Sequence, residues 1–282
     1  MTLPRVVTSI VLAPLFLWVL WLGALPFLTF LFFLVLIALW EFHAMAEEGG
    51  HATQGWWGIF LGLLTASAFI LSGHRPESPF AGQAPAFALT LAAAGALGRE
   101  MARRDKSLSM VRLGMTAAAL LIVAWPLSFL ALLREGRGTG GHFSLGRDAT
   151  FFLVGLIWAQ DTVAWAVGRA IGSHRMAAVI SPKKSWEGAF AGLATAALVG
   201  WGLREAFFPD LFGRGESVVV ALCAGAVAQG SDLAESLLKR CFGVKDSSDL
   251  LPGHGGVLDR FDSFLFSAPF LYFYILATGR GM

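Results

Sequence analysis

The residues best suited to chemistry lie in one polar segment, residues 236–262, of a chain that is otherwise mostly apolar. Lysine, arginine, aspartate, histidine and glycine are concentrated there. A membrane protein keeps ionisable groups at helix ends or in its interior only where another group offsets their loss of hydration, so this concentration predicts a functional site. The mixture of bases and carboxylates predicts binding of a phosphate group together with a metal ion.

Three charged residues near the start of this segment have helical spacing. Asp232, Glu235 and Lys239 are related as i, i+3 and i+7, which places them on one face of a helix. Two acids beside one base suit a metal ion with a phosphate group. The alternative is an ion pair between Glu235 and Lys239 that only satisfies the two charges, and for this pair taken alone we favour that interpretation.

A second set of carboxylates follows, because Asp259 and Asp262 share one face at the start of the last predicted helix. Mg²⁺ takes oxygen ligands and often connects one or two carboxylates to substrate phosphates. The sequence therefore predicts Asp232 and Asp259 as metal ligands. Asp246 and Asp262 are expected to assist them. The four bases Lys239, Arg240, Lys245 and Arg260 are expected to hold the phosphates. Together with Asp246 they are the predicted catalytic residues.

Glycines flank His254 on both sides in the same segment. Glycine lets the backbone approach a ligand closely, so His254 is a candidate substrate-binding residue. A tight turn would also require glycine. The alternative is therefore that His254 makes a structural hydrogen bond.

A second polar segment, residues 181–188, is predicted to begin the seventh helix, because its proline and serines suit a helix N-terminus. Ser181, Lys183 and Lys184 are candidates for binding an anionic headgroup. The alternative is that the two lysines and Trp186 only anchor the helix at the membrane interface.

Asp161 lies within the sixth predicted span, and Arg169 follows eight residues later on the same side. One interpretation is that Asp161 orients Arg169, a candidate substrate-binding residue, or approaches the metal ion. The other is that Asp161 pairs with a neighbouring helix. The sequence leaves both open.

The composition predicts an all-α, polytopic integral membrane protein. Of the 282 residues, 56% are hydrophobic and 14% are charged, about half the charged fraction of a soluble domain. The first uncharged stretch is too long for one span and contains Gly23 and Pro26, so it predicts a helical hairpin and a total of about nine transmembrane helices. The uncharged stretches are residues 6–40, 52–73, 78–98, 113–133, 149–160, 188–203, 217–231 and 263–279.

The distribution of bases predicts which loops face the cytoplasm. Loops 99–112, 169–187 and 237–262 contain five, four and four lysines and arginines and fall on one side of the membrane. Cytoplasmic loops carry an excess of these residues. The N-terminus and both polar segments are therefore expected on the cytoplasmic side.

We expect one membrane domain, residues 1–282, in which residues 1–148 form helices of unmatched sequence and residues 149–282 carry the active site. The net charge of +2, with scattered bases, predicts no nucleic-acid binding. Cys223 and Cys241 lack a CxxC pattern, so no disulfide framework or zinc site is expected. The first stretch continues apolar through Trp40, so we do not expect it to be removed as a signal peptide.

The polar segments closely resemble the signature of the phosphatidate cytidylyltransferases, also called CDP-diacylglycerol synthases. The resemblance covers roughly the C-terminal half. This chain departs from the pattern at Ser231, where the family usually has glycine directly before the aspartate, and at Trp165, which replaces a common tyrosine. The matching elements are Ser236-x-x-Lys239-Arg240, Lys245-Asp246, His254-Gly255-Gly256, Asp259-Arg260-x-Asp262, the SPKKSWEG segment at 181–188, Asp161-Thr162 and Gly168-Arg169.

The resemblance implies a membrane enzyme that joins CTP to phosphatidic acid and releases CDP-diacylglycerol and pyrophosphate. It implies Mg²⁺ as a cofactor, with K⁺ as a further candidate at the same site. The expected location is a bacterial inner membrane, with the active site facing the cytoplasm, and a homodimer is left open. By resemblance, Asp232 and Asp259 are the metal-binding carboxylates, with Asp246 close by. The residues placed on nucleotide or lipid phosphates are Ser181, Lys183 and Lys184.

The competing function is a cation- or proton-coupled membrane transporter. A transporter would also keep Asp161, Asp232 and Glu235 within helices. It does not explain why bases and glycines gather in one loop. It also predicts paired interrupted helices in two related halves, which the sequence does not show.

Overall fold

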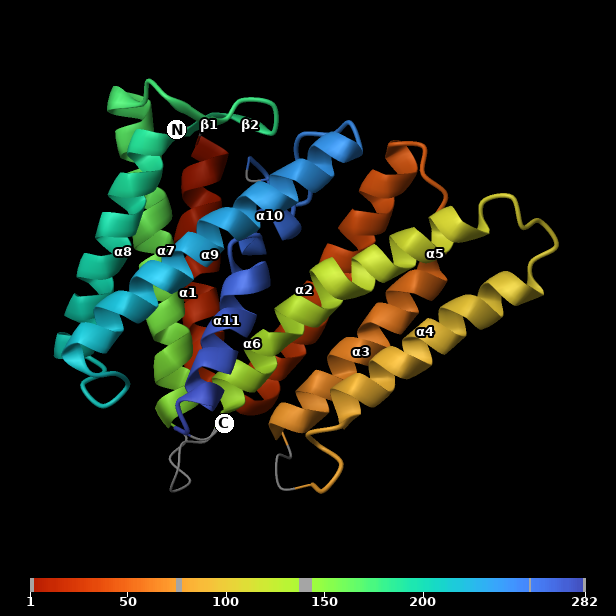
Figure 1. Ribbon diagram of the computed structural model, residues 1–282, viewed down its shortest axis with the longest axis horizontal. Coiled ribbons are helices and arrows are strands. Elements are labelled where there is room, and N and C mark those ends of the chain that lie inside the picture. Colours follow the sequence, from red (N-terminus) through yellow and green to blue (C-terminus); the bar gives the residue numbers. More distant parts are fainter. Residues whose placement is uncertain (1–2, 75–77, 137–143, 254, 281–282) are drawn as a thin grey trace. The chain divides into compact units, whose positions relative to one another are not determined.

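The structure is almost entirely helical (Figure 1). The computed structural model describes residues 3–74, 78–136, 144–253 and 255–280. The chain divides into two compact units, and each is described here by itself. Unit 1 consists of residues 1–135 and 241–261, and unit 2 consists of residues 136–240 and 262–282.

Every predicted apolar stretch coincides with a helix in the described part of the chain. The helices are α1 Leu3–Leu22, α2 Ala24–Glu48, α3 Trp56–His74, α4 Ala84–Ala102, α5 Ser109–Ala118, the π-helical segment η1 Ala119–Ala124, α6 Trp125–Glu135, α7 Ser144–Ile171, α8 Trp186–Ala206, α9 Arg214–Cys241, α10 Leu258–Phe261 and α11 Phe264–Ala277. Among the described residues, five helical segments are long and apolar enough to cross a membrane: α2, α3, the continuous α5–η1–α6 segment, α7 and α9. The all-α, polytopic prediction is confirmed, and the total of nine transmembrane helices stays a prediction.

The break between α1 and α2 falls at Gly23, as predicted, where φ is +59°. A buried pair of residues at the end of α6 holds it. Arg134 Nε donates a hydrogen bond to Leu20 O (2.7 Å), and Glu135 Oε1 accepts one from Ala24 N–H (2.8 Å). The cation thus lies at the C-terminal end of α1 and the carboxylate at the N-terminal end of α2, which suits both helix dipoles.

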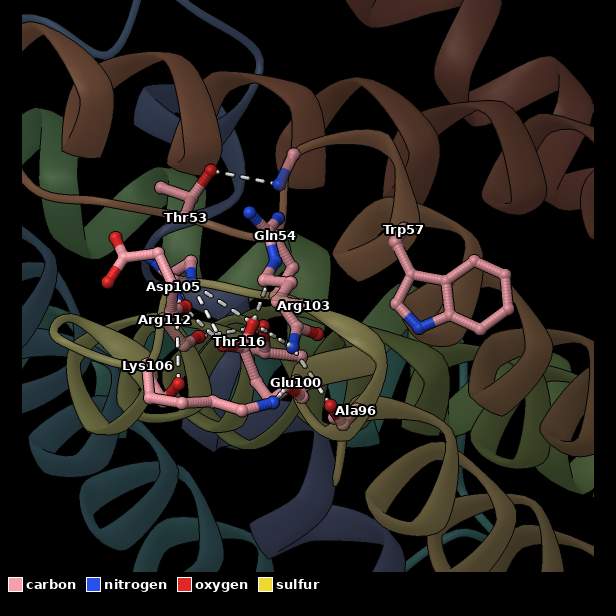
Figure 2. A network of polar contacts seen from close by, with 12 residues as sticks. Thr53, Gln54, Trp57, Ala96, Glu100, Arg103, Asp105, Lys106, Arg112 and Thr116 are labelled. Carbon is pink, nitrogen blue, oxygen red and sulfur yellow. Dashed lines mark hydrogen bonds and ion pairs between the residues drawn. The ribbon is translucent and has the colours of Figure 1, made fainter. Parts of the chain in front are cut away.

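A second buried ion pair joins the ends of α3, α4 and α5 in unit 1 (Figure 2). Arg112 Nη2 lies 2.9 Å from Glu100 Oε2, and Gln54 Nε2 donates to Glu100 Oε1 at 3.0 Å. Arg103 Nε lies 3.2 Å from the same carboxylate, and Lys106 Nζ donates to the Glu100 carbonyl at 2.6 Å. The hydrogen bond from Arg112 is the main reason that the pKa of Glu100 falls to about 2.

In unit 2, α8 packs along α7, and glycines lie where helices approach closely (Figure 1). A Cβ atom built on Gly192 of α8 would lie 3.1 Å from the Cβ of Ala164 on α7. Gln160 of α7 donates from Nε2 to Gly225 O of α9 at 3.0 Å. Small residues let membrane helices approach, and a side-chain amide between them adds a polar contact.

A small β-hairpin connects α7 to α8, in strands β1 Arg175–Ala177 and β2 Ser181–Ser185. Residues 181–185 were predicted to begin the helix, but they form a strand, and α8 begins at Trp186. Ser185 caps the helix, because its Oγ accepts a hydrogen bond from Gly188 N–H at 3.2 Å. The prediction that the helix begins within residues 181–185 is therefore wrong, because these residues form β2.

We expect Glu100→Gln to lower the free energy of unfolding by about 3 kcal/mol, because Arg112 would stay buried without its counter-charge. The folded-state pKa of Glu100 is about 2, against an ordinary value of 4.5. The ionised carboxylate therefore stabilises the fold fully above about pH 4.5, and this contribution is lost as the pH falls towards 2.

Thermal unfolding of the purified protein in detergent between neutral and acidic pH measures this effect. The difference between wild type and variant should narrow as the pH falls. Glu48→Gln, on the exposed end of α2, is the matched control and should unfold like wild type. Equal stability of Glu100→Gln and wild type at neutral pH would contradict the role given to this ion pair.

Candidate active site

In unit 2, an ion pair joins the polar segment 181–188 to helix α9, which runs into the other polar segment. Lys184 Nζ of β2 lies 2.5 Å from Asp232 Oδ2 of α9, and both side chains are partly exposed. Arg240 Nε, at the end of α9, donates a hydrogen bond to Ile180 O in the hairpin at 3.1 Å. The structure therefore brings together three predicted site residues that lie far apart in the sequence.

Glu235 and Lys239 form the predicted ion pair on α9, with Lys239 Nζ 2.7 Å from Glu235 Oε2. Both side chains are buried. The predicted ion pair is thus confirmed, and it lies on the helix that carries Asp232. The charges of Glu235 and Lys239 offset each other in an apolar setting, and the role of Lys239 in holding phosphate stays a prediction.

Asp262 lies at the start of α11, near the acidic residues of α9. Its partial burial raises its pKa well above the ordinary value, and the negative charges of Asp232 and Glu235 raise the pKa further. Ser231 connects the two elements, because its hydroxyl donates to Asp262 O and accepts a hydrogen bond from Phe266 N–H at 3.3 Å. The serine that departs from the family pattern therefore ties α11 to α9.

Asp161 and Arg169 lie on α7 and make different contacts. Ser263 Oγ, at the start of α11, lies 3.5 Å from Asp161 Oδ2, so Asp161 contacts a neighbouring element, and both interpretations of Asp161 stay predictions. The guanidinium of Arg169 lies over the Trp165 ring, 5.5 Å from its centroid. The tryptophan that departs from the family pattern thus supports Arg169.

Two other predicted substrate-binding residues lie on β2. Lys183 is exposed and Ser181 is half-buried. Glu187 stabilises the base of this hairpin, because its carboxylate lies 2.6 Å from His174 Nδ1 and accepts the Ser173 hydroxyl at 2.7 Å. The hydrogen bond with His174, and then that from Ser173, lower the pKa of Glu187. The hairpin that presents the lysines is therefore held by an ionised group.

The remaining predicted residues lie in unit 1, in residues 242–261, which we call the signature segment. Asp259 of α10 is buried, and its Oδ2 accepts three hydrogen bonds. The donors are Ser247 N–H (2.8 Å), Ser247 Oγ (3.0 Å) and Gly256 N–H (2.8 Å). These contacts fix the plane of the Asp259 carboxylate. The exposed members of the segment are Lys245, Asp246 and Arg260, and His254 lies outside the described residues.

Two glycines of the signature segment are required by close contacts. Gly255 has φ of +77°, and a Cβ atom there would lie 2.6 Å from Asp259 Oδ2. A Cβ atom on Gly256 would collide with Ser247 Oγ and with Glu41 Oε1. The second and third positions of the His-Gly-Gly motif are therefore explained by packing against carboxylates.

Glu41 contacts the signature segment, and the sequence analysis did not predict this contact. Its side chain is fully buried at the C-terminal part of α2 and accepts hydrogen bonds from the signature segment. The available signal was weak: Glu41 is the first charged residue after an uncharged stretch of 35 residues, 6–40. A glutamate directly after an apolar stretch is typical of a helix end that is exposed to solvent.

The predicted metal ligands are divided between the units. Asp232 and Asp262 belong to unit 2, and Asp246 and Asp259 belong to unit 1. Among the described residues, no group of three or more His, Cys, Asp or Glu side chains is arranged to hold a metal ion. That all four carboxylates bind one metal ion stays a prediction. Mg²⁺ is commonly held by only one or two carboxylates together with phosphate oxygens, so the carboxylates within either unit have the chemistry that this ion prefers.

Residues 3–278 match the cytidylyltransferase family. The chain belongs to that family. The phosphatidate cytidylyltransferase of Brucella abortus biovar 1 (strain 9-941) is 33% identical over 282 residues, which cover 96% of this chain and 92% of the relative. The phosphatidate cytidylyltransferase of Haemophilus influenzae is 42% identical over 127 residues, covering 43% of this chain and 44% of the relative. That of Staphylococcus epidermidis (strain ATCC 12228) is 44% identical over 124 residues, covering 44% and 47%.

Membership of the cytidylyltransferase family bears on both halves of the chain. The match includes α1 to α6, in which the sequence showed no motif. The N-terminal helices are therefore part of the family's common structure. Neither the family match nor these relatives give support to a transporter.

We expect Gly256→Ala to inactivate the protein and to destabilise it by about 1–3 kcal/mol, because the added methyl group must displace Ser247 or Glu41. Gly98→Ala is the control, since no atom lies within 4 Å of a Cβ at that helical position. Circular dichroism melts and cytidylyltransferase activity of both variants test this. Normal activity of Gly256→Ala would contradict the described packing of the signature segment.

Proposed function

We propose that this protein transfers the cytidylyl group of CTP to phosphatidic acid, producing CDP-diacylglycerol and pyrophosphate. The observation that carries the proposal is the contact between Lys184 and Asp232, because it brings a base of the polar segment 181–188 against a predicted metal-binding carboxylate in a chain of the cytidylyltransferase family. The relatives named phosphatidate cytidylyltransferase, one of them matched over 96% of this chain, support the lipid substrate.

Mg²⁺ is part of this proposal, with K⁺ as a further candidate. The residues that would hold Mg²⁺ are Asp232 and Asp259, assisted by Asp246 and Asp262. All are carboxylates, which hard divalent cations prefer. A bound Mg²⁺ would supply positive charge that draws phosphate oxygens together and stabilises the negative charge of the transition state.

The reaction needs no protein nucleophile. A phosphate oxygen of phosphatidic acid attacks the α-phosphorus of CTP, a new P–O–P linkage forms, and the bond between the α-phosphorus and the β-phosphate oxygen breaks. The electron pair of that bond leaves with pyrophosphate. Two anionic substrates repel each other, so the main task of the protein is to hold them in line and to offset their charge.

The bases of unit 2 are arranged for this task. Lys184 is partly exposed beside Asp232, and Arg240 lies against the hairpin that carries Lys183 and Lys184. Their positive charges would neutralise phosphoryl oxygens as negative charge develops. Arg169, held over Trp165, and Ser181 complete the predicted substrate-binding set in this unit.

The proposed location is a bacterial inner membrane with the site facing the cytoplasm. Apolar helices long enough to cross a membrane and the bacterial relatives support this. The headgroup of phosphatidic acid lies at the membrane interface, where CTP from the cytoplasm can reach it. A homodimer remains a prediction from the sequence.

Transfer of the α-phosphate label of CTP into extractable lipid tests the proposal, using purified protein with phosphatidic acid and Mg²⁺. We expect Asp232→Asn and Asp259→Asn each to lower the rate at least about 100-fold, because each removes a charge that acts on the transition state. Asp210→Asn, an exposed residue outside the site, is the control and should keep full activity. Failure of a well-folded wild type to label lipid would contradict the proposed function.

A further inference from the structure

Glu41 is a buried acidic residue that the reaction described above does not use. It lies on α2, more than 200 residues before the signature segment in the chain, and its side chain has no exposed surface. Burying a carboxylate is unfavourable unless hydrogen bonds or counter-charges replace its hydration. The contacts of Glu41 must therefore replace the hydrogen bonds that its carboxylate would make with water.

Four donors of the signature segment lie within hydrogen-bond distance of the Glu41 carboxylate, and one of them, the Ser247 hydroxyl, is shared with Asp259. Oε1 accepts the Ser248 hydroxyl (2.6 Å) and Val257 N–H (2.8 Å). Oε2 accepts the Ser247 hydroxyl (3.0 Å) and Leu258 N–H (2.7 Å). A carboxylate has about four acceptor positions, so these donors use its full capacity. Two of the donors belong to residues 247–248 and two to residues 257–258. Glu41 thus holds these two parts of the segment together.

Ser247 links this arrangement to Asp259. Its hydroxyl oxygen lies 3.0 Å from Glu41 Oε2 and also 3.0 Å from Asp259 Oδ2. Its backbone N–H donates to the same Asp259 oxygen. A hydroxyl has a single proton, so it can complete a hydrogen bond to only one carboxylate at a time. The position of the Asp259 carboxylate is therefore coupled to that of Glu41.

The start of the signature segment is held in a different way. Phe242 packs edge-on against Phe42 of α2, with ring centroids 5.5 Å apart. A Cβ atom on Gly49 would lie 2.8 Å from Phe242 O, so α2 and the backbone touch there. These apolar contacts do not depend on charge. Loss of the Glu41 carboxylate should therefore loosen the segment around residues 247–258 without detaching its beginning.

We propose that Glu41 is a positioning residue for cytidylyl transfer. Its carboxylate holds residues 247–258 in the conformation that presents Asp259 to the reaction. This inference rests on the proposed function, in which Asp259 is a metal-binding carboxylate. Glutamine cannot replace Glu41, because its amide has one acceptor oxygen and would direct N–H groups at donors.

Hydrogen exchange and transfer activity of Glu41→Gln test the proposal together. We expect the backbone amides that are bonded to Glu41 or Asp259 to exchange at least about tenfold faster than in wild type, while the amides of α3 and α4 stay unchanged. These amides are those of Ser247, Gly256, Val257 and Leu258. We expect the turnover number to fall about 100-fold, because a displacement of about 1 Å at a reacting group costs that much. The Mg²⁺ concentration for half-maximal activity should rise as well.

Glu48→Gln is the matched control, with the same chemical change on an exposed residue of the same helix. It should match wild type in both measurements. Ser248→Ala removes one donor to Glu41 and is the milder variant, to be used if Glu41→Gln does not fold. It should show faster exchange near Val257 and a smaller loss of turnover. In the double variant the two losses should be less than additive, because both act through one contact.

Each outcome decides between positioning and a purely structural role. Faster exchange in Glu41→Gln or Ser248→Ala, with unchanged turnover and unchanged Mg²⁺ dependence, would overturn the positioning role. Unchanged exchange would overturn the contact itself. If wild type transfers no label to lipid, the proposed function fails, whereas the exchange measurement still shows whether Glu41 holds the segment.

Discussion

The buried carboxylate of Glu41 connects α2 with two parts of the signature segment, residues 247–248 and 257–258, which place four hydrogen-bond donors around it. The segment is anchored at its two ends by the apolar side chains of Phe242, Leu258 and Phe261, whereas the residues between them are mostly glycine and polar residues. A buried carboxylate that accepts every available donor gives the segment a fixed shape, because any other shape would leave a charge in the interior without partners. Asp259 is oriented within that shape, and the glycines beside it are a consequence of the same crowding.

The same constraint governs the charges elsewhere in this mostly apolar chain. In unit 2, Glu235 and Lys239 neutralise each other, and Asp232 contacts Lys184 of the hairpin. In unit 1, the Glu100 network joins three helix ends. A site that binds two anions needs bases near carboxylates, and such a mixture is tolerated here because each of the carboxylates just named has an opposite charge or several hydrogen-bond donors within reach. Placing bases near carboxylates therefore serves both the stability of the fold and the binding of phosphate groups.

Much of the fold and part of the site could be predicted from the sequence. The apolar stretches located the helices, Gly23 located the first break, and helical spacing paired Glu235 with Lys239. The role of Glu41 could not be predicted, because an apolar stretch ends at the first charged residue, whereas the hydrogen bonds of α2 continue to Glu48. Its partners lie more than 200 residues away in the chain. The strand at residues 181–185 was missed because serine and proline suit a helix start equally well.

The central claim is transfer of a cytidylyl group to phosphatidic acid. Following the α-phosphate and the γ-phosphate of CTP into their products tests this claim most directly. Purified protein would be given phosphatidic acid, Mg²⁺ and CTP labelled in either the α- or the γ-phosphate. The account predicts that the α-label enters lipid while an equal amount of γ-label appears as pyrophosphate, and that neither occurs without phosphatidic acid. Release of γ-label as inorganic phosphate, or formation of pyrophosphate without labelled lipid, would contradict it.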